Sequence, residues 1–160
     1  MSFKTALIQL PLVCESSGAP VSTPADVHRV CCDIADLAQE TFAVLCIDGR
    51  NRLINRHLVA VGLVGSCPVH PREVYRGAIE SGASAVVLAH NHPSGDPTPS
   101  VEDLRVTRQL IEAGTIIGIR VMDHVIIGRA SEPAGDQPGR PGFLSLREKG
   151  LCSFSGGGAA

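Results

Sequence analysis

Aromatic residues are scarce in this chain of 160 residues, which contains no Trp, one Tyr and four Phe. Since 44% of the residues are nevertheless hydrophobic, aliphatic side chains must fill most of the interior, and such a composition suits layered α/β packing. The same scarcity leaves few side chains that could stack on nucleobases.

The chain has no strong excess of either charge, because its 14 Lys and Arg nearly balance its 16 Asp and Glu and give a net charge of -2. The chain as a whole therefore has no drive for counterion release on DNA or RNA, and a nucleic-acid partner is not favoured. Arg50, Arg52 and Arg56 lie close together in the sequence, and we interpret them as a solvated rim.

Neither a long apolar run nor a paired-cysteine motif is present. The opening segment ALIQLPLV is interrupted by Gln9 and Pro11 and follows a single Lys, so it is typical of neither a signal core nor a membrane span. The six cysteines form no CxxC pair and follow no secretory signal. We therefore expect a reduced, cytoplasmic protein with no membrane partner, and cysteines that pack in the interior.

The length favours one domain with one hydrophobic core. We expect an N-terminal segment over residues 1–20, the folded domain over 21–154 and a disordered tail over 155–160, where Ser, Gly and Ala dominate. Hydrophobic periodicity predicts helices at 24–38, 71–82 and 100–113, strands at 42–47, 53–64, 85–89, 116–122 and 124–128, and an exposed loop at 131–142. This order predicts an α/β fold with a single mixed β-sheet flanked by α-helices.

The segment HNHPSGDPTPSVED, from His90 to Asp103, carries the strongest chemical pattern. It follows the apolar run AVVLA, so both histidines are expected at the end of a buried strand. In extended backbone, residues i and i+2 point the same way with Cα atoms roughly 6–7 Å apart, so His90 and His92 can bind one metal ion. A turn then brings Asp103, in the first turn of the next helix, back as a third ligand. Three protein ligands leave one position open for water, as in catalytic zinc sites.

The structural alternative is that Ser100 and Asp103 form an ordinary helix capping box and that HxH is coincidental. Each half of the pattern is weak alone. Their succession after a buried strand, with a turn rich in Pro and Gly between them, favours the metal site. Ser100 can also serve both purposes, because its hydroxyl could cap the helix and donate to an oxyanion that develops during hydrolysis.

A glutamate followed by HxH, seven residues, Ser, two residues and Asp resembles the JAMM signature of JAB/MPN metalloproteases, here at His90, His92, Ser100 and Asp103. Further strings are similar to the RadC branch of that family: HNHPSGDPTPS, QETF at 39–42, HPREVYRGAI at 70–79, DHVIIG at 123–128 and SLREKGL at 145–151. The resemblance spans roughly residues 21–151. It implies one Zn2+ and hydrolysis of a peptide or isopeptide bond, by analogy with deubiquitinating relatives.

Longer members of the RadC branch carry an N-terminal helix-hairpin-helix module for DNA binding, and we expect this protein to lack it. Residues 131–142 resemble an insertion. We therefore expect a peptide or protein substrate and weak DNA binding at most, whereas the sequence does not indicate an oligomeric state.

The resemblance also indicates the residue that transfers the proton. Glu40 in QETF matches the family's glutamate and precedes the strand at 42–47, from whose end a carboxylate could face a neighbouring strand. The alternative for Glu40 is a solvated charge after the first helix. Glu73 has a simpler explanation in the first turn of a helix, where a carboxylate favours the positive helix end. Glu80 is expected to be solvated late in a helix, and Glu102, although next to Asp103, is expected to point elsewhere on its helix.

His124 lies near the metal according to the resemblance, but we interpret it as a hydrogen-bonded structural histidine and leave it out of the ligand set.

A cupin also uses an HxH motif, but the cupin fold is all-β, whereas helices are predicted before and after the motif here, and a far-UV spectrum rich in helix would settle the point. A zinc deaminase is rejected, because it needs a PCxxC element and the sequence contains no CxxC. A metal-dependent nuclease or DNA-processing factor ranks second, since the same activated water could attack phosphorus. A non-catalytic, metal-bound interaction domain ranks third. A peptidase or isopeptidase ranks first because the net charge and the scarce aromatics disfavour a nuclease.

Overall fold

The computed structural model describes residues 13–15, 18–62, 69–132, 139 and 141–154 of the chain. The predicted tail at 155–160 and most of the predicted N-terminal segment lie outside the described residues, as does much of the predicted loop at 131–142. At the ends of that loop Ser131, Glu132 and Pro141 are exposed, whereas Gly142 is buried.

Within the described residues, six strands form one sheet in the order β1-β3-β2-β4-β5-β6. They are β1 (Val13–Glu15), β2 (Glu40–Ile47), β3 (Leu53–Gly62), β4 (Ala85–Asn91), β5 (Arg120–Ile127) and β6 (Phe143–Ser145). β4 and β5 are parallel and every other neighbouring pair is antiparallel. The sheet is therefore mixed, as the sequence predicted.

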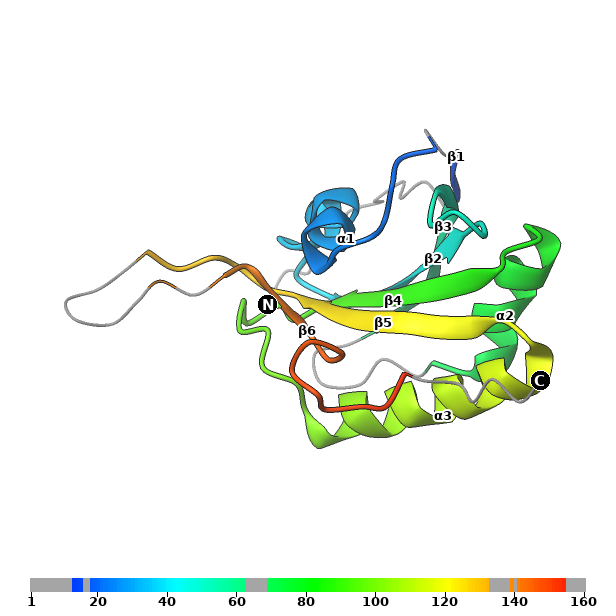
Figure 1. Cartoon of the computed structure of the whole chain (residues 1–160). Helices are drawn as coiled ribbons and strands as arrows, with labels where there is room; N and C mark the ends of the chain where they lie inside the picture. The colour runs from blue at the N-terminus through cyan, green and yellow to red at the C-terminus, as the bar shows by residue number, and fades with distance from the viewer. Residues whose placement is uncertain (1–12, 16–17, 63–68, 133–138, 140, 155–160) are drawn as a thin grey trace, which may run out of the picture.

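Helices cover both faces of this sheet, which confirms the predicted α/β fold (Figure 1). The helices are α1 (Pro24–Val30), the short 3-10 helix η1 (Cys32–Ile34), α2 (Pro71–Glu80) and α3 (Val101–Ile117). In Figure 1, α1 lies on one side of the sheet and α2 and α3 on the other. None of the helices in the described residues has the length and apolar character that crossing a membrane requires.

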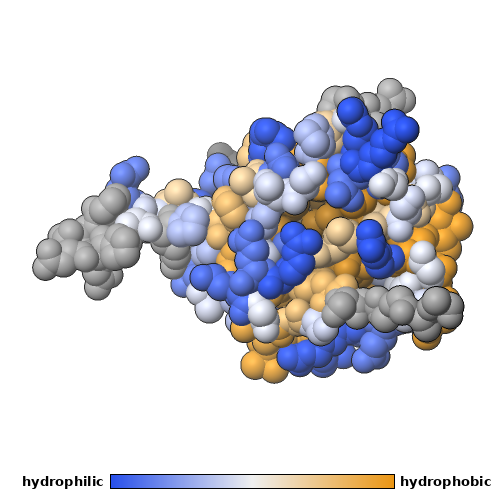
Figure 2. All heavy atoms as spheres, in the orientation of Figure 1, coloured by the Kyte–Doolittle hydropathy of each residue, from blue (hydrophilic) through white to orange (hydrophobic). Residues whose placement is uncertain are grey.

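The alternation of side chains along the central strands divides the hydrophobic core into two layers. Val44, Val86 and Leu88 pack toward α2 and α3, whereas Leu45 and Val87 pack toward α1. All seven residues of β4 are buried, as expected for a strand covered on both faces. Figure 2 shows that hydrophilic side chains are spread over the visible face, with hydrophobic surface between them.

The first helix is shorter than predicted because a buried arginine binds its end. α1 stops at Val30, whose carbonyl accepts a hydrogen bond from Arg56 Nη1 at 2.7 Å. The Ile34 amide then donates to Cys31, and the chain tightens into η1. Arg56 is only 5% exposed and binds both oxygens of Asp33 at 2.6 Å. Its interpretation as part of a solvated rim is therefore wrong.

The last helix is longer than predicted, because Gly114 does not end it. α3 continues to Ile117 and ends at Gly118, whose φ of 81° is the left-handed conformation of a C-cap. A Cβ atom on Gly114 would collide with the Tyr75 side chain and the Ile119 carbonyl. Gly114 thus permits close packing rather than marking a stop.

The two strands predicted at 116–122 and 124–128 are one strand, β5, with an irregularity where the break was predicted. Val86 pairs with Val121, but its neighbour Val87 pairs with Asp123, so β5 contains one extra residue. Met122 and Asp123 both line a pocket on the α1 side, and His124 consequently faces α3. Such a bulge bends a strand and redirects the side chains beyond it.

Candidate metal centre

The end of β4 places two histidines on the face covered by α3. Val86 and Leu88 pack on this face, and His90 follows with the same alternation. The His92 amide donates to the Ile127 carbonyl at 2.9 Å, which extends the pairing with β5 beyond Asn91. His92 therefore points to the same side as His90.

The turn after His92 is held by hydrogen bonds to its own backbone and to the chain after β5. The Gly95 amide donates to the His92 carbonyl at 2.8 Å, and Gly95 has a φ of 82°, which favours glycine. Arg129 donates to the carbonyls of Gly95 (2.8 Å) and Pro93 (2.7 Å). The turn thereby directs the chain into α3 close to the histidines.

Three side chains from β4, its following turn and α3 meet at one point. His90 Nε2 lies 2.9 Å from His92 Nε2 and 3.2 Å from Asp103 Oδ1, and His92 Nε2 lies 3.4 Å from Asp103 Oδ2. Ligand atoms of a tetrahedral zinc, at about 2.0–2.1 Å from the ion, are separated by about 3.3 Å. His90, His92 and Asp103 can therefore hold a metal ion.

The second ring nitrogen of each histidine has a partner that orients the ring. His92 Nδ1 lies 2.8 Å from the Asp96 carbonyl, which can only accept, so His92 carries its hydrogen on Nδ1. His90 Nδ1 lies 2.8 Å from His124 Nε2. Such partners of the non-ligating nitrogen are typical of metal-binding histidines, so the donor set fits a metal ion.

The pKa values of these groups reflect their mutual contacts in the metal-free chain. Burial acts to raise the pKa of Asp103, but hydrogen bonds from His90 and His92 hold that pKa well below its usual range. Burial acts to lower the pKa of His92, yet hydrogen bonds with Asp103 and the Asp96 carbonyl, together with the charges of Asp103 and Glu40, raise it above its ordinary value. The cluster thus favours a positive charge, supplied by a proton or by a metal ion.

Glu40 is the first residue of β2 and lies at the same end of the sheet as the cluster. Phe42 pairs with His90 across the antiparallel β2–β4 ladder, and Glu40 lies on the same face of β2 as Phe42, two residues away. Its side chain is half-buried. The structure therefore brings Glu40 to the edge of the cluster, whereas its role in proton transfer stays a prediction.

Asn91 fixes the backbone on both sides of Glu40, a function that the sequence analysis did not find. Its Nδ2 donates to the Gln39 carbonyl at 3.2 Å and the Leu37 carbonyl at 3.3 Å, and its Oδ1 accepts from the Thr41 amide at 2.7 Å. Asn91 is fully buried. The signal was available, because Asn91 is a polar residue between the two histidines at the end of a buried strand.

Ser100 and Asp103 form the predicted capping box of α3. Ser100 Oγ accepts from the Asp103 amide at 3.1 Å, and Asp103 Oδ2 accepts from the Ser100 amide at 2.6 Å. The cap orients the Asp103 carboxylate toward the histidines, so the structural alternative and the metal site are compatible. The same arrangement places Ser100 next to the cluster.

The other glutamates have the structural environments that the sequence predicted. Glu73 accepts from the His70 amide in the capping box of α2. Glu102 pairs with Arg105 on the exposed side of α3, and Glu80 is exposed. None of these contacts involves the cluster.

His124 is fully buried and hydrogen-bonded, as predicted, but its partners connect it to the cluster. Besides His90 it contacts the Thr107 hydroxyl at 2.6 Å. Burial and the neighbouring His90 lower the pKa of His124 well below its ordinary value. Thr107 was not predicted to take part in the site, although it follows Asp103 by four residues and so lies on the same helix face.

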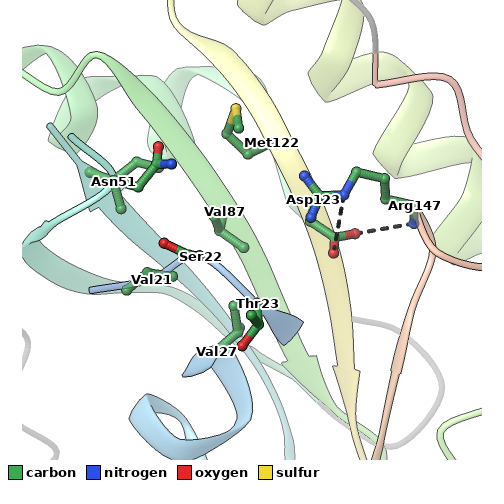
Figure 3. Close-up of a pocket in the computed structure, with 10 residues that line it drawn as sticks. Val21, Ser22, Thr23, Val27, Asn51, Val87, Met122, Asp123 and Arg147 are labelled. Carbon is green, nitrogen blue, oxygen red and sulfur yellow. Dashed lines mark hydrogen bonds and ion pairs between the residues drawn. The ribbon is translucent and has the colours of Figure 1, made fainter. Parts of the chain in front are cut away.

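A separate small pocket lies on the α1 side of the sheet, lined by residues before and within α1 and by β5 (Figure 3). Asp123 and Arg147 face each other there, with 3.9 Å between Arg147 Nε and Asp123 Oδ2. The carboxylate also accepts from Ser145 Oγ at 2.6 Å and from the Arg147 amide at 3.1 Å. Asp123 therefore attaches the segment around β6 to β5, and the pocket offers no metal-binding group comparable with the histidine cluster.

Comparison with known proteins agrees with the geometry. The model of the RadC-like JAB domain matches residues 21–151. The UPF0758 protein TTE0897 of Caldanaerobacter subterraneus subsp. tengcongensis is 42% identical over 147 residues, which cover 91% of this chain and 58% of the relative. A UPF0758 protein of Pelobacter propionicus is 54% identical over 119 residues, covering 74% of this chain and 47% of the relative.

The chain thus spans about half the length of the curated relatives it matches. The match and the His-His-Asp group together support a metal-dependent, hydrolase-like domain. The chain belongs to the family of RadC-like JAB domains.

Proposed function

We propose that this domain is a zinc-dependent hydrolase that cleaves a peptide or isopeptide bond. The observation that carries the proposal is the convergence of two imidazole Nε2 atoms and one carboxylate within 3.4 Å of one another. Zinc is the proposed ion because it prefers nitrogen and carboxylate ligands in tetrahedral sites. Held by three protein ligands, it would acidify a water molecule and polarise a carbonyl group.

Glu40 and Ser100 are the proposed acid-base residue and oxyanion donor. From the edge of the cluster, the Glu40 carboxylate would take the proton of the attacking water and pass it to the leaving amine. The Ser100 hydroxyl accepts from the Asp103 amide through its oxygen, so its hydrogen is available to donate to an oxyanion. The side chain of His92 is 16% exposed, so the cluster is accessible from solvent.

A polypeptide substrate is proposed ahead of a nucleic acid. Support comes from the net charge of -2 and from the single cluster of metal ligands within the described residues, since many nucleases use two ions held by several carboxylates. Peptide or isopeptide hydrolysis is assigned to this chain by analogy with the family that it resembles.

The test is a substrate panel with a chelator arm. Purified protein is incubated with peptides, isopeptide-linked conjugates, single-stranded DNA and double-stranded DNA, before and after chelation and after zinc is returned. Chelator-sensitive cleavage of a peptide or isopeptide bond is expected, lost in Asp103→Ala and retained in Glu102→Ala, a neighbouring exposed carboxylate. Chelator-sensitive cleavage of DNA alone would replace the proposal with a nuclease.

A further inference from the structure

A closed chain of contacts joins His90 to α3 behind the candidate metal centre. His90 Nδ1 lies 2.8 Å from Nε2 of His124 on β5, and His124 Nδ1 lies 2.6 Å from the Thr107 hydroxyl on α3. The same hydroxyl lies 2.6 Å from the Asp103 carbonyl. His90, His124 and Thr107 are 1%, 0% and 0% exposed, so bulk water does not compete for these contacts.

The Asp103 carbonyl sets the direction of every hydrogen bond in this chain. A carbonyl oxygen only accepts, so the single hydroxyl hydrogen of Thr107 points to Asp103, and the Thr107 oxygen must accept from His124 Nδ1. A neutral His124 then presents a bare Nε2, which accepts from His90 Nδ1. His90 Nδ1 therefore carries a hydrogen, and Nε2 is the nitrogen of His90 that is left to bind a metal ion.

His90 Nε2 is the atom that faces His92 and Asp103. The neutral form of His124 is favoured by its full burial and by its two ring partners, His90 and Thr107, neither of which is a carboxylate. Phe42 restricts the orientation of both rings, because it stacks on His90 with 5.9 Å between ring centroids and meets His124 edge-on at 5.4 Å. The ring of His90 is thus fixed in both orientation and hydrogen placement.

We propose that Thr107 and His124 are positioning residues that hold a hydrogen on His90 Nδ1 and so present Nε2 of His90 to the metal ion. The purpose of this arrangement rests on the proposed function, but the hydrogen on His90 Nδ1 is a property of the metal-free chain. A His90 without that hydrogen would have to accept from His124 and would keep its hydrogen on Nε2, the atom that faces the other ligands. The bulge in β5 is part of the arrangement, since it turns His124 toward α3.

The first experiment uses the unaltered, metal-free protein. Nitrogen-15 labelling of the histidines and long-range proton–nitrogen correlation spectra report which ring nitrogen carries the hydrogen. The expected result is Nδ1–H for both His90 and His124, which is the less favoured tautomer of free histidine. A His90 Nδ1 that carries no hydrogen would overturn the proposal, whether or not the chain hydrolyses any substrate.

The second experiment compares Thr107→Val with Thr107→Ser. Val keeps the branched shape and removes the hydroxyl, so His124 is freed to carry its hydrogen on Nε2 and to donate to His90. We expect His90 to lose its Nδ1 hydrogen in Thr107→Val. Zinc affinity, measured by competition with a chromophoric chelator, should fall about 10–100-fold. Thr107→Ser keeps the hydroxyl, so both the Nδ1 hydrogen and the zinc affinity should be as in the unaltered protein. Unchanged tautomers in Thr107→Val would contradict the proposal even if zinc affinity fell, because a merely structural loss would then explain the affinity.

Discussion

Glu40 lies at the edge of the cluster and forms no hydrogen bond or ion pair with His90, His92 or Asp103, so the geometry specifies its chemistry less directly than theirs. Its side chain lies on the face of β2 that carries Phe42, beside His90, and Asn91 holds the backbone before and after it. Glu40→Gln keeps the size and removes the base. We expect zinc content and fold to be unchanged and turnover to fall about 10²–10⁴-fold, the usual contribution of a general base.

Glu73→Gln is the matched control for Glu40→Gln, because a glutamine also satisfies a capping box and Glu73 contacts His70 rather than the cluster. Its turnover should stay within about two-fold of the unaltered protein, on the scale of an exposed substitution. Steady-state rates on a verified substrate decide the point. Full turnover in Glu40→Gln would show that another group transfers the proton.

Among the elements, the junction of η1 with β3 depends on the ion pair between Asp33 and Arg56. Arg56 is 5% exposed, so removal of Asp33 leaves a buried charge that has lost its carboxylate partner and keeps the Val30 carbonyl. Because Asp33 itself is 46% exposed, we expect Asp33→Ala to lower the free energy of unfolding by about 1–3 kcal/mol, less than a fully buried pair would.

Asp36→Ala is the control for Asp33→Ala in the same segment. Asp36 is 87% exposed and lies 3.8 Å from Arg129, so its loss should change stability by less than about 0.5 kcal/mol. Urea unfolding of both variants gives the comparison. Equal stabilities would mean that the Arg56 pair contributes nothing beyond a surface contact.

The packing of α3 against α2 gives a second prediction at the scale of elements. Alanine has a helix propensity about 1 kcal/mol better than glycine, but a Cβ atom at Gly114 would collide with Tyr75 and with the rigid Ile119 carbonyl. Overpacking commonly costs about 1–3 kcal/mol, and the colliding carbonyl belongs to the backbone. We therefore expect Gly114→Ala to be less stable in thermal unfolding. Thr115→Ala, on the exposed side of the same turn, should be nearly neutral, and a more stable Gly114→Ala would contradict the packing account.

At the scale of the whole molecule, the α/β class, the mixed sheet and the meeting of His90, His92 and Asp103 could be predicted from the sequence. They depend on local patterns: an apolar strand, the i and i+2 alternation, and a helix cap at Ser100. Arg56, Gly114 and the break in β5 were misjudged because each depends on a partner distant in the sequence. The burial of Arg56 depends on its ion pair with Asp33. Gly114 is required because Tyr75 packs against it. His124 turns toward α3 because β5 contains one extra residue opposite β4.

The charge of the whole chain leads to a prediction about nucleic acid. With 14 basic and 16 acidic residues, few phosphate contacts can form, so affinity for DNA should be weak and should disappear as salt is raised. Fluorescence anisotropy with labelled single-stranded and double-stranded DNA from low to physiological salt measures this. Tight binding at physiological salt would favour the nuclease interpretation.

The zinc content of the purified chain tests the central claim most directly. Elemental analysis should find about one zinc per chain, because three protein ligands and water complete a tetrahedral site. His92→Ala and Asp103→Ala should each lose the metal while circular dichroism shows the fold retained, and Glu102→Ala, whose carboxylate pairs with Arg105, should keep it. Zinc content unchanged in both His92→Ala and Asp103→Ala would contradict the account.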